Sequence, residues 1–310
     1  METEQRPLSE IIAKSLYSDS AIRNADLARL SDLKDDDLSQ FRKAWSNAEV
    51  TRRAEVAGKL VSIGEDDVTL DFTRVFRVSL DDPDPGIRLK ALEGLGLEDK
   101  YTVVRPILKT LKTDESAEVR EAAARTAGKF ALLAELGDFP EAVGKDIFEG
   151  LLDVLENTSE PIGVRRRALE SIAPFQQELV DNYIEDFYYS EEPGVKASAL
   201  FAMGRNCQSR WLNFLIDELQ SSDSEIRFEA ARASGEIGEE EAVPGLLILL
   251  DDNDHEVQEA AVMALGKIGG QEARQALQRL SKSHDTRIKD AAKSALTELE
   301  TCEDPISSNF

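Results

Sequence analysis

The C-terminal part of the chain repeats a short pattern every 31 residues. Each copy has a branched apolar residue, an alanine four residues later and a small residue three positions after the alanine. The branched residues that begin the copies are Val164, Val195, Ile226, Val257 and Ile288, and the first copy departs from the pattern only in having a serine at the small position. A fixed period of this length indicates a solenoid, in which one small unit stacks on copies of itself.

Each repeat is expected to contain two antiparallel helices. In the repeat that ends near Gly269, the spacing of apolar residues predicts a first helix over 241–250 and a second helix over 255–268. The acidic segment 251–254 between them is rich in residues that cap helix starts. One alanine position recurs in four repeats, and a leucine there is expected to overpack the joint between helices at a cost of ~1–3 kcal/mol. These alanines are Ala199, Ala230, Ala261 and Ala292.

Upstream copies of the pattern are less regular. Two copies begin at Ile87 and Val119, and a degraded one begins at Val50. The step from Val119 to the next copy is longer than the period, which predicts an insertion near 131–145, made of a lengthened helix end and a loop. We therefore expect an N-terminal helical cap over 1–46, an array of about seven repeats over 47–300 and a mobile tail over 301–310.

The turns between helices carry a second pattern. An Asp or Ser lies six residues before the residue that opens the second helix, as in Asp82 with Arg88, Asp114 with Arg120 and Ser221 with Arg227. This arrangement resembles the HEAT-repeat family, in particular the short HEAT-like repeats of phycobilisome lyases, and the chain is similar to uncharacterised bacterial HEAT-repeat proteins. The resemblance implies an all-α, right-handed solenoid of antiparallel helix pairs. It also implies Asp–Arg ladders between adjacent turns, which Gln258 should interrupt.

Composition excludes several classes of function. The net charge is −24, and such acidity repels nucleic-acid phosphates and anionic lipids, so neither is expected as a partner. The same charge favours a basic partner or serves solubility. The two cysteines, Cys207 and Cys302, lie far apart and form no disulfide framework, which fits a cytoplasmic protein. No signal segment or membrane span is expected.

The sequence contains no recognisable catalytic or cofactor motif. His255-Glu256 resembles the His-Glu pairs by which HEAT-like deoxyhypusine hydroxylases bind iron, but the chain has only two histidines. A di-iron site needs several His and carboxylate ligands in one place, so no metal is expected. Cys207 has no neighbouring base and is expected to be a buried or half-buried thiol. We therefore expect no enzymatic activity and no cofactor.

One helix face is a candidate for binding a partner. In HEAT-type stacking the second helices line the concave side, and residues two and six positions after each branched residue should point off the buried stripe. Aromatic and arginine side chains in such places are enriched at interface hot spots. The candidate partner-binding residues are Arg166, Phe201, Arg227, Phe228, Arg232 and Met263. The alternative that both phenylalanines pack between layers remains open.

The expected function is a non-enzymatic scaffold that binds a protein or peptide along the concave surface. The alternative, which the resemblance implies, is a lyase or lyase subunit that handles a tetrapyrrole chromophore.

Overall fold

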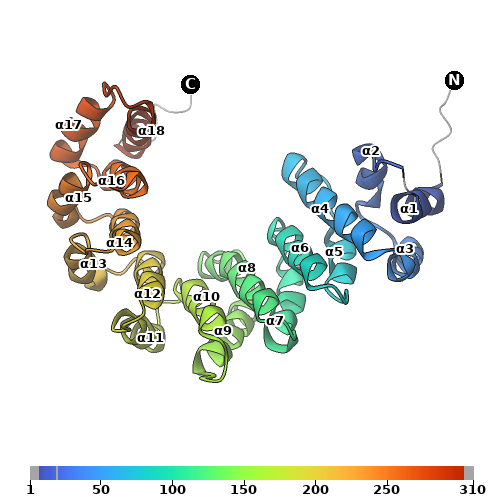
Figure 1. Cartoon of the computed structure of the whole chain (residues 1–310). Helices are drawn as coiled ribbons and strands as arrows, with labels where there is room; N and C mark the ends of the chain where they lie inside the picture. The colour runs from blue at the N-terminus through green and yellow to red at the C-terminus, as the bar shows by residue number, and fades with distance from the viewer. Residues whose placement is uncertain (1–6, 19, 304–310) are drawn as a thin grey trace. The chain divides into compact units, whose positions relative to one another are not determined.

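A computed structural model describes residues 7–18 and 20–303, except for the side chains of 302 and 303. The described residues form eighteen α-helices, α1 to α18, four short 3-10 helices and no strand. Successive helices form antiparallel pairs (Figure 1), so the predicted all-α solenoid of helix pairs is confirmed. The chain divides into two compact units, Met1–Ser171 and Ile172–Phe310.

The N-terminal unit contains the predicted cap and the irregular repeats. Its helices are α1 (Leu8–Tyr17), α2 (Asn24–Leu27), α3 (Asp35–Asn47), α4 (Val50–Asp66), α5 (Thr73–Ser79), α6 (Pro85–Gly96), α7 (Val104–Thr113), α8 (Ala117–Glu135), α9 (Glu141–Glu156) and α10, which runs from Ile162 to Ile172. Helices α1 and α2, and α3 up to residue 46, lie within the predicted cap. Residues 1–6 of the cap lie outside the described residues.

The predicted insertion lengthens two helices. Helix α8 continues to Glu135, a loop covers 136–140, and α9 begins at Glu141. Helix α8 thus extends into the region of the predicted insertion, and a loop follows it. Residues 141–145, however, belong to the next helix, because the glycine at 144 does not interrupt it.

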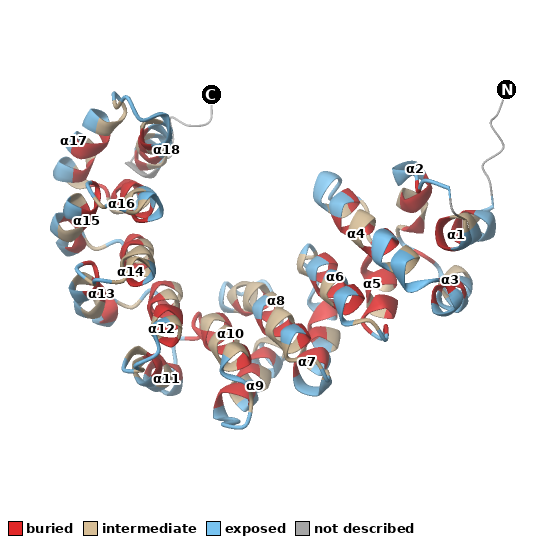
Figure 2. Ribbon diagram, in the orientation of Figure 1, coloured by how far each residue is buried: buried red, intermediate tan, exposed pale blue. Residues whose placement is uncertain are grey.

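The C-terminal unit contains the regular repeats in two layers. The first helices are α11 (Glu178–Tyr188), α13 (Leu212–Glu218), α15 (Val243–Leu249) and α17 (Gly270–Leu280). The second helices are α12 (Pro193–Asn206), α14 (Ser224–Ile237), α16 (His255–Ile268) and α18 (Thr286–Glu303). Each second helix packs on the next along the stack, and buried residues concentrate where helices face each other (Figure 2).

Two predicted boundaries in this unit were inexact. The helix predicted over 241–250 begins as a 3-10 turn, Glu240–Ala242, before α15. Of the predicted tail, residues 301–303 complete α18. Residues 304–310 lie outside the described residues.

Glycine–alanine contacts set the spacing between the second helices. A Cβ atom added to Gly235 would lie 2.7 Å from the Cα of Ala264 on the next helix. The same clash, at 2.8 Å, would arise between Gly204 and the Cα of Ala233. Only glycine allows so close a backbone approach. The alanines singled out in the sequence, such as Ala230 and Ala261, are fully buried.

A ladder of ion pairs joins adjacent turns. Arg88 donates from Nε and Nη2 to the two carboxylate oxygens of Asp114, both at 2.8 Å, and from Nη1 to the carbonyl of Asp82 at 2.8 Å. Arg227 repeats this geometry with Asp252 (2.7 and 2.8 Å) and with the carbonyl of Ser221 (2.8 Å). Each arginine therefore bonds the backbone of its own turn and the carboxylate of the next turn.

The ladder is interrupted where the sequence loses its basic residue, as expected. At the next level, Gln258 donates from Nε2 to the carbonyl of Asp252 at 2.6 Å. It therefore keeps the bond to the backbone of its own turn. A neutral amide cannot form the ion pair to the following turn.

The rung between Arg227 and Asp252 should make stability depend on pH. The Arg227 guanidinium lowers the pKa of Asp252 below its ordinary value of 3.8. A depressed pKa in the folded state stabilises the fold above the unfolded pKa, and this contribution is lost as pH falls through the folded value. We expect Asp252→Asn to be less stable than the wild type at pH 7 and to approach it below pH 3.8, as measured by urea unfolding. A pH-independent difference would contradict this account.

Candidate partner-binding site

The candidate site lies on the surface of α12, α14 and α16 that points away from the first helices, here called the second-helix face. The 31-residue period places equivalent residues side by side on successive helices. The position six residues after the branched residue is occupied by Phe201, then Arg232, then Met263. Phe228 on α14 and Glu259 on α16 share the position two residues after it. All but Glu259 are half-buried, and Glu259 is exposed.

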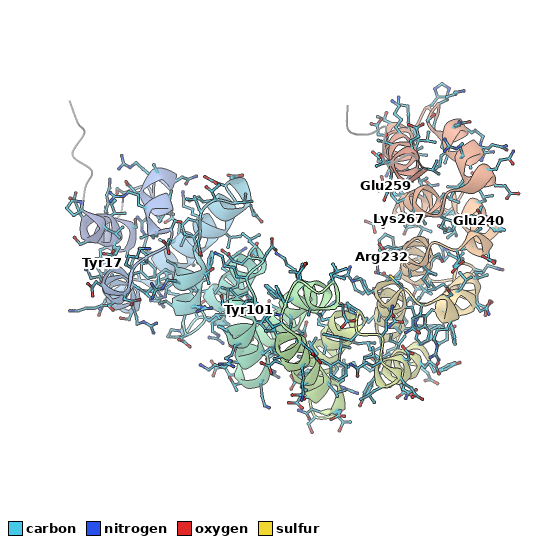
Figure 3. All side chains as sticks on the ribbon, turned by 180° about the vertical axis from the view of Figure 1, so that it is seen from behind. Tyr17, Tyr101, Arg232, Glu240, Glu259 and Lys267 are labelled. Atoms are coloured by element: carbon cyan, nitrogen blue, oxygen red, sulfur yellow. The ribbon has the colours of Figure 1, made fainter. Side chains whose placement is uncertain are left out.

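A hollow of about 450 Å³ opens between α14 and α16 on this face. We call it the Phe228 groove. Its lining residues are Phe228, Arg232, Glu256, Glu259, Ala260, Met263, Ala264 and Lys267. Figure 3 shows Arg232, Glu259 and Lys267 together on this side of the unit, with Glu240 of the first-helix layer on the opposite side.

Small residues account for the depth of the groove. Ala260 and Ala264 lie one helical turn apart on α16, and both are buried. Their short side chains leave space between Phe228 of α14 and Met263 of α16. The contact of Ala264 with Gly235 holds the two helices close together beneath this space. The groove is therefore a product of the same packing that builds the stack.

Arg232 is held in place before any partner arrives. Its guanidinium carbon lies 4.2 Å from the ring centroid of Phe201, within the range of a cation–π interaction. Its Nε donates to the carboxylate of Glu229 at 2.9 Å, one turn earlier on α14. Phe201 therefore lies beneath Arg232 and does not line the groove itself.

The rim of the groove has an excess of negative charge. Lys267 is paired with Glu236 at 2.7 Å, and Arg232 with Glu229, so both cations already have anionic partners. Glu256 and Glu259 are exposed, and among the described residues neither carboxylate makes an ion pair or a side-chain hydrogen bond. These two glutamates lie three residues apart on one face of α16.

Two of the six predicted residues lie elsewhere. Arg227 belongs to the ladder, where Asp252 binds it through two hydrogen bonds and raises its pKa, and its side chain is only 16% exposed. The prediction that it binds a partner is therefore not supported by its position, because the residue next to the branched position points toward the turns. Arg166 is half-buried on α10 in the N-terminal unit and is not part of the groove.

The other residues considered for chemistry do not form a site. Among the described residues, no group of three or more His, Cys, Asp and Glu side chains is arranged to hold a metal ion. His255 is exposed, and its Nδ1 lies 3.2 Å from Oε1 of Gln258. Cys207 ends α12 in the left-handed conformation, with φ 55°, at a position that Gly238 occupies in the next repeat. The residue is exposed, so the expectation of a buried or half-buried thiol was wrong, and its Sγ donates to the carbonyl of Gly204 at 3.0 Å.

The described helices also bear on the membrane prediction. None of them is long and apolar enough to cross a bilayer.

Comparison with known families agrees with this architecture. The family model for HEAT repeats matches residues 74–143, 183–261 and 212–297, more than half of the chain. The chain therefore belongs to the HEAT-repeat family. Among curated protein sequences, none is similar enough to count as a match.

Solved structures of importin-β share the fold at low sequence identity. Yeast importin-β (Kap95p) is 13% identical, with a TM-score of 0.57, over 94% of this chain and 46% of its own. Kap95 in its complex with Nup1 is 15% identical, with a TM-score of 0.53, over 94% of this chain and 45% of its own. The chain thus spans about half the length of importin-β. The CpcE–CpcF complex of phycocyanin lyase from Nostoc sp. PCC7120 is 20% identical, with a TM-score of 0.49, over 74% of this chain and 94% of its own.

Proposed function

We propose that the protein is a non-enzymatic scaffold that binds a protein or peptide on the second-helix face of its C-terminal unit. The Phe228 groove carries this proposal. It combines a phenylalanine ring, a methionine and a positioned arginine around a hollow, and these residue types are enriched at protein interfaces. The Kap95–Nup1 complex supports the proposal in general terms, as a solenoid of similar fold with a bound partner.

The binding mechanism is shape and distributed contact. A second-helix layer built from repeats presents equivalent positions at regular intervals, so an extended partner can contact several helices at once. The net charge of −24 favours a basic partner. The groove is formed by packing within one stack, so little reorganisation is needed on binding.

The double variant Phe228→Ala, Arg232→Ala tests the proposed site. Both side chains are half-buried on one face of α14, so their removal should weaken partner capture at least tenfold while the helix content stays unchanged. The measurement compares affinity capture from the source cell, quantified by mass spectrometry, with circular dichroism of the purified variants.

A matched control removes the same kinds of side chain from the first-helix layer. Ile248 on α15 is 68% exposed, and Arg279 on α17 is exposed. The variant Ile248→Ala, Arg279→Ala should capture the same proteins as the wild type. Equal losses from both variants would refute the site, and unfolding of the groove variant would show that Phe228 is a core residue.

The tetrapyrrole alternative makes a different prediction. A lyase subunit that holds a bilin should shift the visible absorption band of the chromophore when the two are mixed. A scaffold should leave the spectrum unchanged, and we expect no shift. A shifted band that persists in the double variant would replace the scaffold proposal with the chromophore role.

A further inference from the structure

We infer that the Phe228 groove recognises a peptide segment with one apolar anchor side chain flanked by lysine or arginine. The inference rests on the proposed binding function and specifies the chemistry of the partner at that site. Three features of the groove carry it: an apolar floor, two cations that are already neutralised, and two carboxylates without partners.

The floor of the groove suits a single apolar side chain. Ala260 and Ala264 form its base, and Phe228 and Met263 stand on opposite sides. None of these four side chains has a hydrogen-bond donor, and the Met263 thioether is only a weak acceptor. A polar anchor placed there would lose its hydrogen bonds to water without replacement. The unbranched methionine side chain allows anchors of different shape, such as leucine, methionine or phenylalanine.

The rim determines the charge of the flanking residues. Arg232 and Lys267 could attract an acidic segment, but each is bonded to a glutamate of its own unit, at 2.9 and 2.7 Å. An incoming carboxylate would have to compete with those bonds, and the donor of Arg232 that has no partner among the described residues, Nη2, is buried. The incoming carboxylate would also approach Glu256 and Glu259, neither of which makes an ion pair or a side-chain hydrogen bond with a described residue. A lysine or arginine meets no such competition and finds two exposed carboxylates.

Geometry places these carboxylates along the axis of α16. Glu256, Glu259 and Met263 lie at i, i+3 and i+7 and so share one face of the helix. An anchor beside Met263 therefore has both carboxylates on the same side of it, toward the N-terminus of α16. Basic residues on both sides of the anchor therefore allow a bound peptide to reach these carboxylates in either chain direction.

The test uses three synthetic peptides and fluorescence anisotropy with the full chain. The first has a leucine anchor preceded and followed by lysines in a glycine–serine background. The second replaces the leucine by serine, and the third replaces the lysines by glutamates. We expect the wild type to bind the first peptide at least tenfold more tightly than either of the others. Weaker binding in added salt is also expected, because the flanking contacts are exposed charge pairs.

Charge reversal distinguishes the groove from general acidity. The variant Glu256→Lys, Glu259→Lys should reverse the preference and bind the glutamate peptide more tightly than the lysine peptide. The control Glu241→Lys, Glu272→Lys makes the same change in net charge at exposed positions of the first-helix layer and should behave like the wild type. Equal binding of the lysine peptide by all three proteins would overturn the inference, since it would show non-specific attraction to an acidic chain.

The peptide experiment and the test of the proposed function can fail independently of each other. If the Phe228→Ala, Arg232→Ala variant loses its cellular partner but the lysine peptide does not bind the wild type, the site stands and the partner chemistry inferred here is wrong. If that variant keeps its cellular partner, the proposed function is wrong, regardless of how tightly the peptides bind the wild type.

Discussion

Gly235→Ala should destabilise the C-terminal unit by about 3 kcal/mol, near the upper end of the range for overpacking a well-packed joint. The new methyl group would lie 2.7 Å from the Cα and 2.9 Å from the Cβ of Ala264, and neither backbone can yield without moving a whole helix. The higher helix propensity of alanine offsets only about 1 kcal/mol of this cost. Hydrogen exchange of the amides in α14 and α16 measures the loss locally.

A glycine in an open position provides the control. Gly58 lies in α4 and has no atom within 4 Å of an added Cβ. The same substitution there should stabilise the N-terminal unit by about 0.5–1 kcal/mol, because alanine is the better helix former. If Gly235→Ala were equally tolerated, the glycine–alanine contact would not determine the helix spacing. The floor of the Phe228 groove would then need another explanation.

Arg88→Ala should destabilise the N-terminal unit by about 3–5 kcal/mol, because it leaves the carboxylate of Asp114 buried without its charge partner. The side chains of Arg88 and Asp114 are only 7% and 8% exposed. The carbonyl of Asp82 also loses its donor. Protection of the amides in α6 and α8 against hydrogen exchange reports the effect.

A later repeat of the chain suggests a matched variant for the Arg88→Ala test. Gln258 directly follows the branched residue of its repeat, as Lys196 does two repeats earlier. Gln258 keeps the bond to the backbone of its own turn. Arg88→Gln combined with Asp114→Asn should therefore recover part of the stability lost in Arg88→Ala, since no buried charge is left alone. A loss below 1 kcal/mol for Arg88→Ala would show that the rung contributes little.

Much of the fold could be predicted because the repeat encodes it locally. The spacing of Val257, Ala261 and Ala264 defines one buried stripe, and the acidic turn before it defines a helix start. The partner of each ladder arginine could not be predicted from spacing alone. Arg227 bonds the carboxylate of Asp252 in the following turn, and the six-residue spacing within one turn reflects only its bond to a carbonyl.

Part of the candidate site could also be predicted because the repeat encodes it locally. A fixed period places Phe201, Arg232 and Met263 at one position on successive helices, so their proximity follows from the repeat. The hollow depends on how closely α14 and α16 approach, and that distance is set by the contact of Gly235 with Ala264. The repeating glycine was the signal that could have indicated it. Glu256 was considered only as a possible metal ligand beside His255, and not for binding a partner.

Methionine-specific photo-crosslinking tests the central claim most directly. Of the three methionines in the chain, Met263 lines the groove and Met203 is completely buried in α12. Cells that incorporate a diazirine analogue of methionine would carry the reactive group at both positions. The account predicts crosslinks from residue 263 to another protein, which Phe228→Ala with Arg232→Ala abolishes, and none from residue 203. Intermolecular crosslinks absent from residue 263, or unchanged in the double variant, would contradict it.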